Sequence, residues 1–248
     1  MIKKIKYVIQ EFWSFLKYPH IENTNKVGFF YYLIGLGIVE IVAAILSVGI
    51  LFLFGTIDLP VIQHDTSGHL EPIPYMWSFL FAVLITPFVE ELSFRYPLKY
   101  KKNSLFIAFS VLFIISSFTN NYAIRCKILN IPIDFDYREF VFRLLWYIAF
   151  ILLIFVVTRF DKVNKILSKF WDRYLIVIIY VLAGYFAYLH FSLPQTGINW
   201  IWLPAMVLPQ FFSALYFSYI RLKVKFSYCV FLHMILNGVA LFPGLFDI

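Results

Sequence analysis

Charged residues are scarce in this chain of 248 residues. Asp, Glu, Lys and Arg together make up 14% of the sequence, while hydrophobic residues make up 62% and the mean hydropathy is +0.81. Soluble domains contain about a quarter charged residues, so the composition excludes an ordinary soluble domain. It predicts an all-α, polytopic membrane protein, because a helix that crosses a bilayer needs roughly 20 apolar residues.

Cysteine is equally rare, and only Cys126 and Cys229 are present. Because Cys229 lies within an apolar run, the two predict no disulfide framework. The sequence also lacks internal repeats and low-complexity tracts. Its N-terminus lacks the apolar core and small-residue cleavage site of a signal peptide. We therefore expect a transmembrane helical bundle without a separate soluble domain.

Long apolar runs are the main feature that is present, and they predict about seven spans. The candidate spans are 29–54, 75–96, 104–119, 140–158, 174–191, 198–220 and 226–245. Residues 1–27 are expected to form a cytoplasmic amphipathic segment whose helix lies at the membrane interface, because apolar residues recur there at helical spacing. Residues 28–248 are expected to form a single transmembrane domain.

The net charge of +7 is explained by topology rather than by nucleic-acid binding. In an alternating seven-span arrangement, 17 of the 21 basic residues fall on one side, and loops 55–74 and 193–197 contain none. Positive residues concentrate on the cytoplasmic side of membrane proteins. We therefore expect a cytoplasmic N-terminus, an external Ile248, and membrane lipids but no nucleic acid among the partners.

Ionisable residues within the apolar runs are the candidates for function, because they are costly in a membrane. The stretch FVEELSFR places Glu90 and Glu91 at the end of an apolar run, with Arg95 four residues after Glu91. Residues four apart share a helix face, so Glu91 and Arg95 are expected to pair. Glu90 lies about 100° around the helix and is left as a candidate general base. Pro87 is expected to kink or open the helix just before them.

Two further patterns recur at a spacing of four residues. FAYLH places Phe186 before His190, and HMILN places His233 before Asn237. Each pattern has an ordinary structural explanation. The acidic pair with its arginine is often a solvated cluster, His190 is compatible with an interfacial histidine, and His233 with Asn237 is compatible with a hydrogen-bonded contact between helices.

In this order, EELSFR, FAYLH and HMILN resemble the EExxxR, FxxxH and HxxxN motifs of the CPBP intramembrane proteases. This group includes the CAAX prenyl endopeptidases and bacterial relatives linked to bacteriocin self-immunity. The similarity covers about residues 75–245 and implies a membrane hydrolase that cleaves peptide bonds. The stretch between Arg95 and Phe186 is longer than in many relatives, and the excess near 104–158 is interpreted as an extra pair of helices.

The resemblance implies a role for each motif residue. Glu90 would activate a water molecule with the assistance of His190, and His233 and Asn237 would stabilise the oxyanion. Glu91, Arg95 and Phe186 would support the site. Amide hydrolysis independently requires a proton acceptor for water and donors aimed at the developing negative charge.

Three alternatives stay open. No HExxH motif is present, and we expect no cofactor, but Glu90, His190 and His233 also have the chemistry of a zinc set with an open water position. A non-catalytic membrane scaffold or immunity protein would keep the same residues. A transporter or channel would use them as a proton or ion relay.

The expected partner is a peptide or protein substrate, which is lipid-modified in part of the family. The expected location is a bacterial cytoplasmic membrane, crossed several times.

Overall fold

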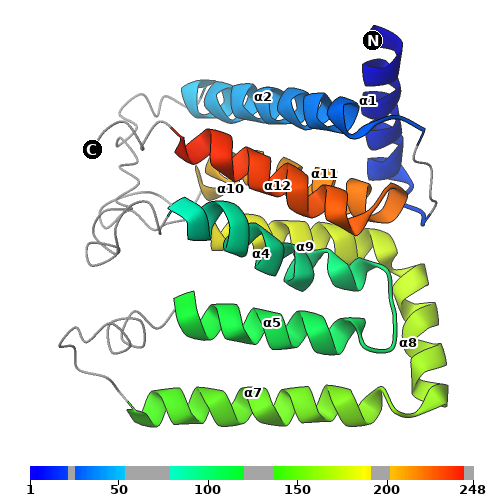
Figure 1. Ribbon diagram of the computed structural model, residues 1–248, viewed down its shortest axis with the longest axis vertical. Coiled ribbons are helices and arrows are strands. Elements are labelled where there is room, and N and C mark those ends of the chain that lie inside the picture. The colour runs from blue at the N-terminus through cyan, green and yellow to red at the C-terminus, as the bar shows by residue number, and fades with distance from the viewer. Residues whose placement is uncertain (22–25, 54–78, 120–136, 191–201, 243–248) are drawn as a thin grey trace. The chain divides into compact units, whose positions relative to one another are not determined.

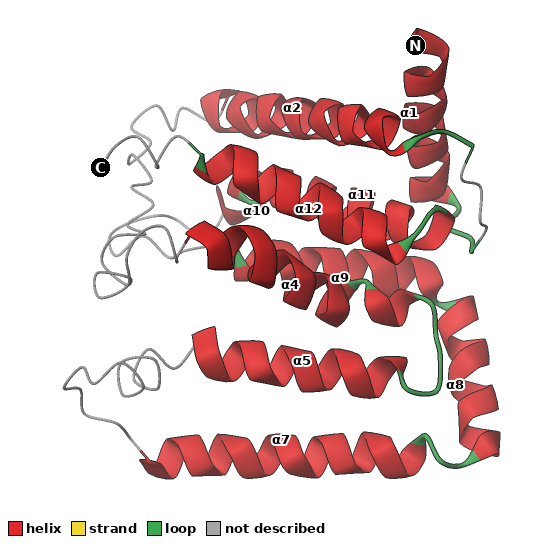
Figure 2. Ribbon diagram, in the orientation of Figure 1, coloured by secondary structure: helices red, strands yellow, loops and turns green. Residues whose placement is uncertain are grey.

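The structure is a computed structural model that describes residues 1–21, 26–53, 79–119, 137–190 and 202–242. All regular secondary structure in these ranges is helical (Figures 1 and 2). The predicted all-α class is therefore confirmed for the described part of the chain. The chain divides into two compact units, Met1–Asp65 with Tyr174–His233, and Thr66–Arg173 with Met234–Ile248.

Unit 1 contains the N-terminal helices and the helices that follow residue 173. They are α1 (Ile2–Lys17), α2 (Phe29–Leu53), α9 (Leu175–Leu189), α10 (Leu203–Met206), α11 (Leu208–Lys223) and the first half of α12 (Phe226–Leu241). Helix α11 packs against α1, α2 and α9. Its residues from Ser213 to Lys223 are all buried, which is the pattern of a helix enclosed by its neighbours.

An aromatic cluster joins α1 and α2 to α11. The ring of Phe12 lies 5.1 Å from that of Tyr216, and the ring of Tyr216 lies 5.6 Å from that of Tyr219. The Tyr216 hydroxyl donates a hydrogen bond of 2.8 Å to the Tyr32 carbonyl. The apolar face of α1, with Val8, Phe12 and Phe15, is thus buried against protein. The expected amphipathic helix is present, while its position at a membrane interface stays a prediction.

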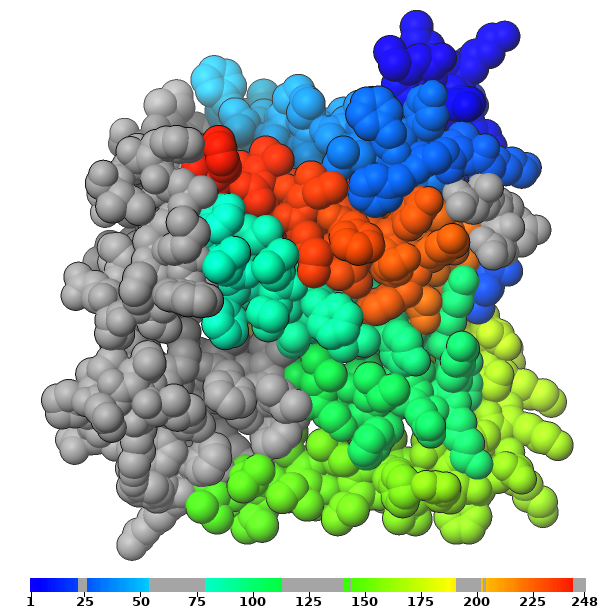
Figure 3. All heavy atoms as spheres, in the orientation of Figure 1, coloured from blue at the N-terminus to red at the C-terminus, as the bar shows by residue number. Residues whose placement is uncertain are grey.

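Unit 2 contains the middle of the chain and the last turns of α12. Its elements are a π-helical segment η1 (Phe81–Ile85), α4 (Thr86–Phe94), a 3₁₀ turn η2 (Tyr96–Leu98), α5 (Ser104–Thr119), α7 (Tyr137–Val157) and α8 (Asp161–Arg173). Helix α5 packs between α4 and α7. Side chains close the gap between the α5 and α7 ribbons, as Figure 3 shows, and the rings of Phe109 and Phe150 meet there at 5.2 Å.

The chain turns sharply between α7 and α8. Segments Leu144–Val157 and Asp161–Arg173 meet at 101°. Asn164 holds this corner, since its amide donates to the carbonyls of Thr158 and Phe160 and its oxygen accepts a 2.9 Å bond from the Tyr100 hydroxyl. Burial raises the pKa of Tyr100, which keeps this hydroxyl a donor. Helix α8 is amphipathic. A helix in this segment was not predicted from the sequence.

Helix α2 is the one helix, within the described residues, that is long and apolar enough to cross a membrane by itself. It has 25 residues, and only 28% of its most apolar window is buried. The bent pair of α7 and α8 counts as a second candidate if it is treated as one span. Large apolar side chains are exposed along both α2 and α7, among them Ile41, Ile45, Leu145 and Leu153.

The apolar runs predicted as spans are mostly helical where they fall on described residues, while their crossing of a membrane stays a prediction. The segment predicted at 104–119 has the bounds of α5, and the extra helical pair predicted near 104–158 is present as α5 and α7. The run predicted at 198–220 is broken, because α10 ends at Met206 and α11 begins at Leu208. Loops 55–74 and 193–197, which support the topology, and Cys126 lie outside the described residues.

Gly35 lies where α1, α2 and α11 meet. A β-carbon there would lie 2.5 Å from the Tyr216 hydroxyl oxygen and 2.8 Å from Val8. We expect Gly35→Ala to displace Tyr216 and to lower the free energy of unfolding by about 1–3 kcal/mol. Thermal unfolding of the purified protein in detergent measures this effect.

Gly37→Ala provides the matched control. It lies on the same helix, and a β-carbon there meets nothing within 4 Å. It should leave stability unchanged or raise it slightly. Equal unfolding temperatures for the two variants would show that the three helices do not meet at Gly35.

Candidate active site

The first motif lies on α4, directly after a widened helical turn. In η1 the backbone hydrogen bonds run from an N–H to the carbonyl five residues earlier, instead of four. The Thr86 N–H, for example, donates to the Phe81 carbonyl. The next donor in this register would be Pro87, which has no N–H. The expectation that Pro87 opens the helix before the acidic pair is therefore confirmed, and π-helical turns of this kind are frequent at functional sites.

Asn237 replaces the missing donor. Its side-chain Nδ2 donates a 2.9 Å hydrogen bond to the Ala82 carbonyl, the acceptor that Pro87 would have served in the π register. The third motif thus contacts the helical segment that leads into the first motif, within unit 2. One of the two Nδ2 hydrogens is used in this bond, and the other is left for another acceptor.

Glu91 and Arg95 form the expected ion pair. The Arg95 Nη1 lies 3.4 Å from the Glu91 Oε1, and both side chains are almost completely buried. Removing one partner of such a pair leaves an uncompensated buried charge, so the two residues fix the orientation of α4 together. Glu90 lies on another face of the helix and is only partly buried. This placement agrees with the separate role that the spacing predicts for Glu90.

His190 ends α9 and is oriented by its own motif. Its Nδ1 lies 2.8 Å from the Phe186 carbonyl. A carbonyl oxygen only accepts, so Nδ1 is the donor in this contact, and in the neutral form of the ring Nε2 therefore keeps the lone pair. The Phe186 ring lies 4.3 Å from the His190 ring. This tautomer is the one that a base or a metal ligand at Nε2 requires.

His233 is buried on α12 between two aromatic rings. It stacks on Phe217, with centroids 4.9 Å apart and planes 20° apart, and meets the edge of Phe186 at 6.0 Å. Phe186 therefore contacts both histidines, which brings the second and third motifs together within unit 1. The resemblance implies a supporting role for Phe186, and that role stays a prediction.

The motif residues are divided between the two units. Phe186, His190 and His233 belong to unit 1, whereas Glu90, Glu91, Arg95 and Asn237 belong to unit 2. The approach of Glu90 to the histidines stays a prediction. Among the described residues no three His, Cys, Asp or Glu side chains are grouped as metal ligands, and the zinc alternative likewise stays open.

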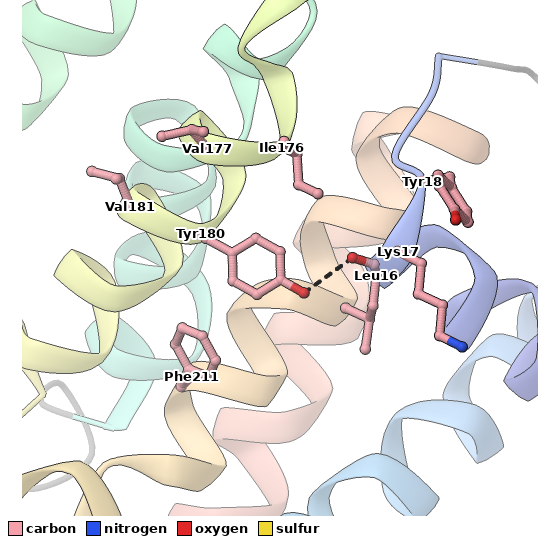
Figure 4. A pocket seen from close by; sticks show the side chains of 8 residues that line it. All are labelled: Leu16, Lys17, Tyr18, Ile176, Val177, Tyr180, Val181 and Phe211. Atoms are coloured by element: carbon pink, nitrogen blue, oxygen red, sulfur yellow. Dashed lines mark hydrogen bonds between the residues drawn. The ribbon is translucent and has the colours of Figure 1, made fainter.

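Glu40 is visible in the sequence as an ionisable residue within the apolar run 29–54, whereas a groove in unit 1 was not predicted. Glu40 on α2 accepts a hydrogen bond from the Ser213 hydroxyl on α11, which joins two polar groups of unit 1. A groove of about 870 Å³ runs between the end of α1 and the start of α9, and the Tyr180 hydroxyl bonds the Leu16 carbonyl within it (Figure 4). No motif residue lines this groove. The sequence carries no signal for the groove, because the groove depends on how helices distant along the chain pack.

The bond from Asn237 to Ala82 can be tested by a double-mutant cycle. Asn237→Ala should lower the free energy of unfolding by about 1 kcal/mol, because the Ala82 carbonyl loses its donor. In a Pro87→Ala background the restored N–H serves that carbonyl, so the same Asn237→Ala change should cost less. Thermal unfolding of the four proteins in detergent gives the coupling, and equal costs in both backgrounds would refute the compensation.

Comparison of the chain with protein-family models, with curated proteins and with solved structures gives no match. The function is therefore argued from the residues of this chain and from the motifs that they resemble.

Proposed function

We propose that this chain is a multi-pass membrane endopeptidase that hydrolyses a peptide bond with a water molecule activated by Glu90. The observation that carries the proposal is the ordered set of three motifs. The described contacts support it, because Phe186 touches both motif histidines and Asn237 holds the helical segment in front of Glu90.

The membrane location is supported by surface chemistry. Apolar side chains cover exposed faces of α2 and α7, and exposed apolar area on this scale requires lipid or another protein to cover it. In the seven-span arrangement that we propose, 17 of the 21 basic residues lie on one side, which is the side that faces the cytoplasm in membrane proteins. A bacterial cytoplasmic membrane, with the N-terminus in the cytoplasm, is the location that we propose.

The proposed reaction assigns one task to each polar group. Glu90 takes a proton from water, and the resulting hydroxide attacks the carbonyl carbon of the peptide. His190, with its lone pair on Nε2, assists in holding that water. His233 and the second Nδ2 hydrogen of Asn237 stabilise the tetrahedral oxyanion. The carbon–nitrogen bond then breaks, and the proton held by Glu90 passes to the leaving amine.

Glu90→Gln tests the proposal directly. The amide keeps the shape of the side chain but cannot accept the proton, so cleavage should fall by at least about a hundredfold. The measurement is cleavage of quenched fluorescent peptides by the protein in liposomes. Asp172→Asn on exposed α8 is the matched control and should cleave at the wild-type rate.

Wild-type cleavage by Glu90→Gln would eliminate Glu90 as the base. A wild-type protein that cleaves no peptide but keeps a biological effect would favour the scaffold or immunity alternative. Proton flux across liposomes that disappears in Glu90→Gln would favour the relay alternative.

Metal removal separates the glutamate mechanism from the zinc alternative. Exhaustive treatment with a chelator should leave the cleavage rate unchanged, because the proposed mechanism uses no metal. Elemental content is measured on the same sample. A loss of cleavage that returns with added zinc would establish Glu90, His190 and His233 as metal ligands instead.

A further inference from the structure

A pocket of about 310 Å³ opens in unit 2 where α5 begins and α7 ends. It is distinct from the motif residues, none of which lines it. The residues around it divide into a polar rim and an apolar floor, and they are Lys102, Asn103, Phe106, Ile107, Phe155, Thr158 and Arg159.

The rim is positively charged. Lys102 and Arg159 are both exposed, and the Arg159 guanidinium lies 4.3 Å from the centre of the Phe155 ring. One carboxylate is close, since the Asp161 Oδ1 lies 3.8 Å from the Lys102 Nζ. The side chains of this pair are 48% and 90% exposed, so their attraction is weak. The positive end of the α5 dipole and the negative end of the α7 dipole both lie at this pocket and offset each other, so the positive charge of the rim comes from Lys102 and Arg159. The rim therefore favours an anion.

The floor is apolar and continues onto the outer face of α7. The rings of Phe106 and Phe155 lie 6.0 Å apart, and Ile107 completes the floor. Leu152 and Val156, one turn or less from Phe155 on α7, are exposed. A ligand that places an anion at the rim can thus lay a hydrocarbon chain along this face.

The corner beneath the rim is rigid. The Thr158 hydroxyl donates to the Phe155 carbonyl, and Asn164 bonds the Thr158 carbonyl. The Tyr100 hydroxyl bonds Asn164, and the Tyr100 ring lies tilted against the Trp171 ring, with centroids 5.9 Å apart. These bonds hold α8 across the end of α7, so the backbone beneath the rim is already in place when a ligand arrives.

We propose that this pocket binds one anionic phospholipid of the cytoplasmic leaflet. The phosphate lies between Lys102 and Arg159, and an acyl chain lies over Phe106 and Phe155. A soluble phosphate would satisfy the rim but would leave the apolar floor uncovered, and basic pockets of this kind at the cytoplasmic ends of membrane helices bind lipid headgroups. The proposal uses the membrane location and topology proposed above and is independent of peptide hydrolysis.

Lipid titration followed by native mass spectrometry tests the site on the full chain in mild detergent. Phosphatidylglycerol should bind more tightly than phosphatidylcholine with the same acyl chains. The double variant Lys102→Gln/Arg159→Gln should weaken phosphatidylglycerol binding by about tenfold or more, because each cation near the headgroup contributes a severalfold gain. The variant Lys165→Gln/Lys169→Gln removes the same charge from exposed positions of α8 outside the pocket and should bind as the wild type does.

Three results would overturn the proposal. Equal binding of the two lipids would show that the rim does not select an anion. An equal loss in both double variants would show general attraction to basic surface. If inorganic phosphate displaced phosphatidylglycerol when both were present at the same concentration, the pocket would bind the anion alone and would have no subsite for the acyl chain. Thermal unfolding of both variants verifies that they are folded, and because binding is the readout, an inactive protease does not affect the result.

Discussion

Polar groups on apolar helices must find their partners within the protein, and this constraint organises the described parts of the chain. Pro87 removes a donor, the helix before it widens, and the Asn237 amide supplies the missing hydrogen to Ala82. Glu91, four residues after Pro87 on α4, is neutralised by Arg95 in a buried pair. Glu40 receives the Ser213 hydroxyl in unit 1. In a low-dielectric surrounding each such bond costs more to break than it would in water.

The same constraint gives Asn237 two tasks. As a helix partner it keeps the segment before Glu90 in the π register, and as a donor it is available to an oxyanion through its second hydrogen. A loss of activity when Asn237 is replaced therefore combines the loss of the helix contact with the loss of the oxyanion donor. The Phe186 carbonyl has a comparable part in the second motif, because it selects the tautomer of His190. Backbone carbonyls thus orient two of the proposed catalytic side chains.

Much of the helical pattern was readable from the sequence, because long apolar runs leave few alternatives to helix. The bounds of α5, the pairing of Glu91 with Arg95 and the effect of Pro87 follow from spacing alone. Pro204 and Pro209 lie on either side of the break between α10 and α11 and indicate a bend in that run, whereas the sharp corner before α8 was not predicted. Asn164 fixes this corner through bonds to residues that sequence spacing does not connect. The contact between Phe186 and His233 joins α9 to α12, and no local pattern encodes it.

The central claim is that Glu90 and the two motif histidines share one water molecule. A cryo-electron microscopy map of the protein in a lipid nanodisc measures this most directly. The account predicts that the Glu90 carboxylate lies within about 6 Å of the imidazole nitrogens of His190 and His233, the span of two hydrogen bonds through one water. A Glu90 carboxylate separated from both rings by much more than that distance, in protein that cleaves peptide, would contradict it.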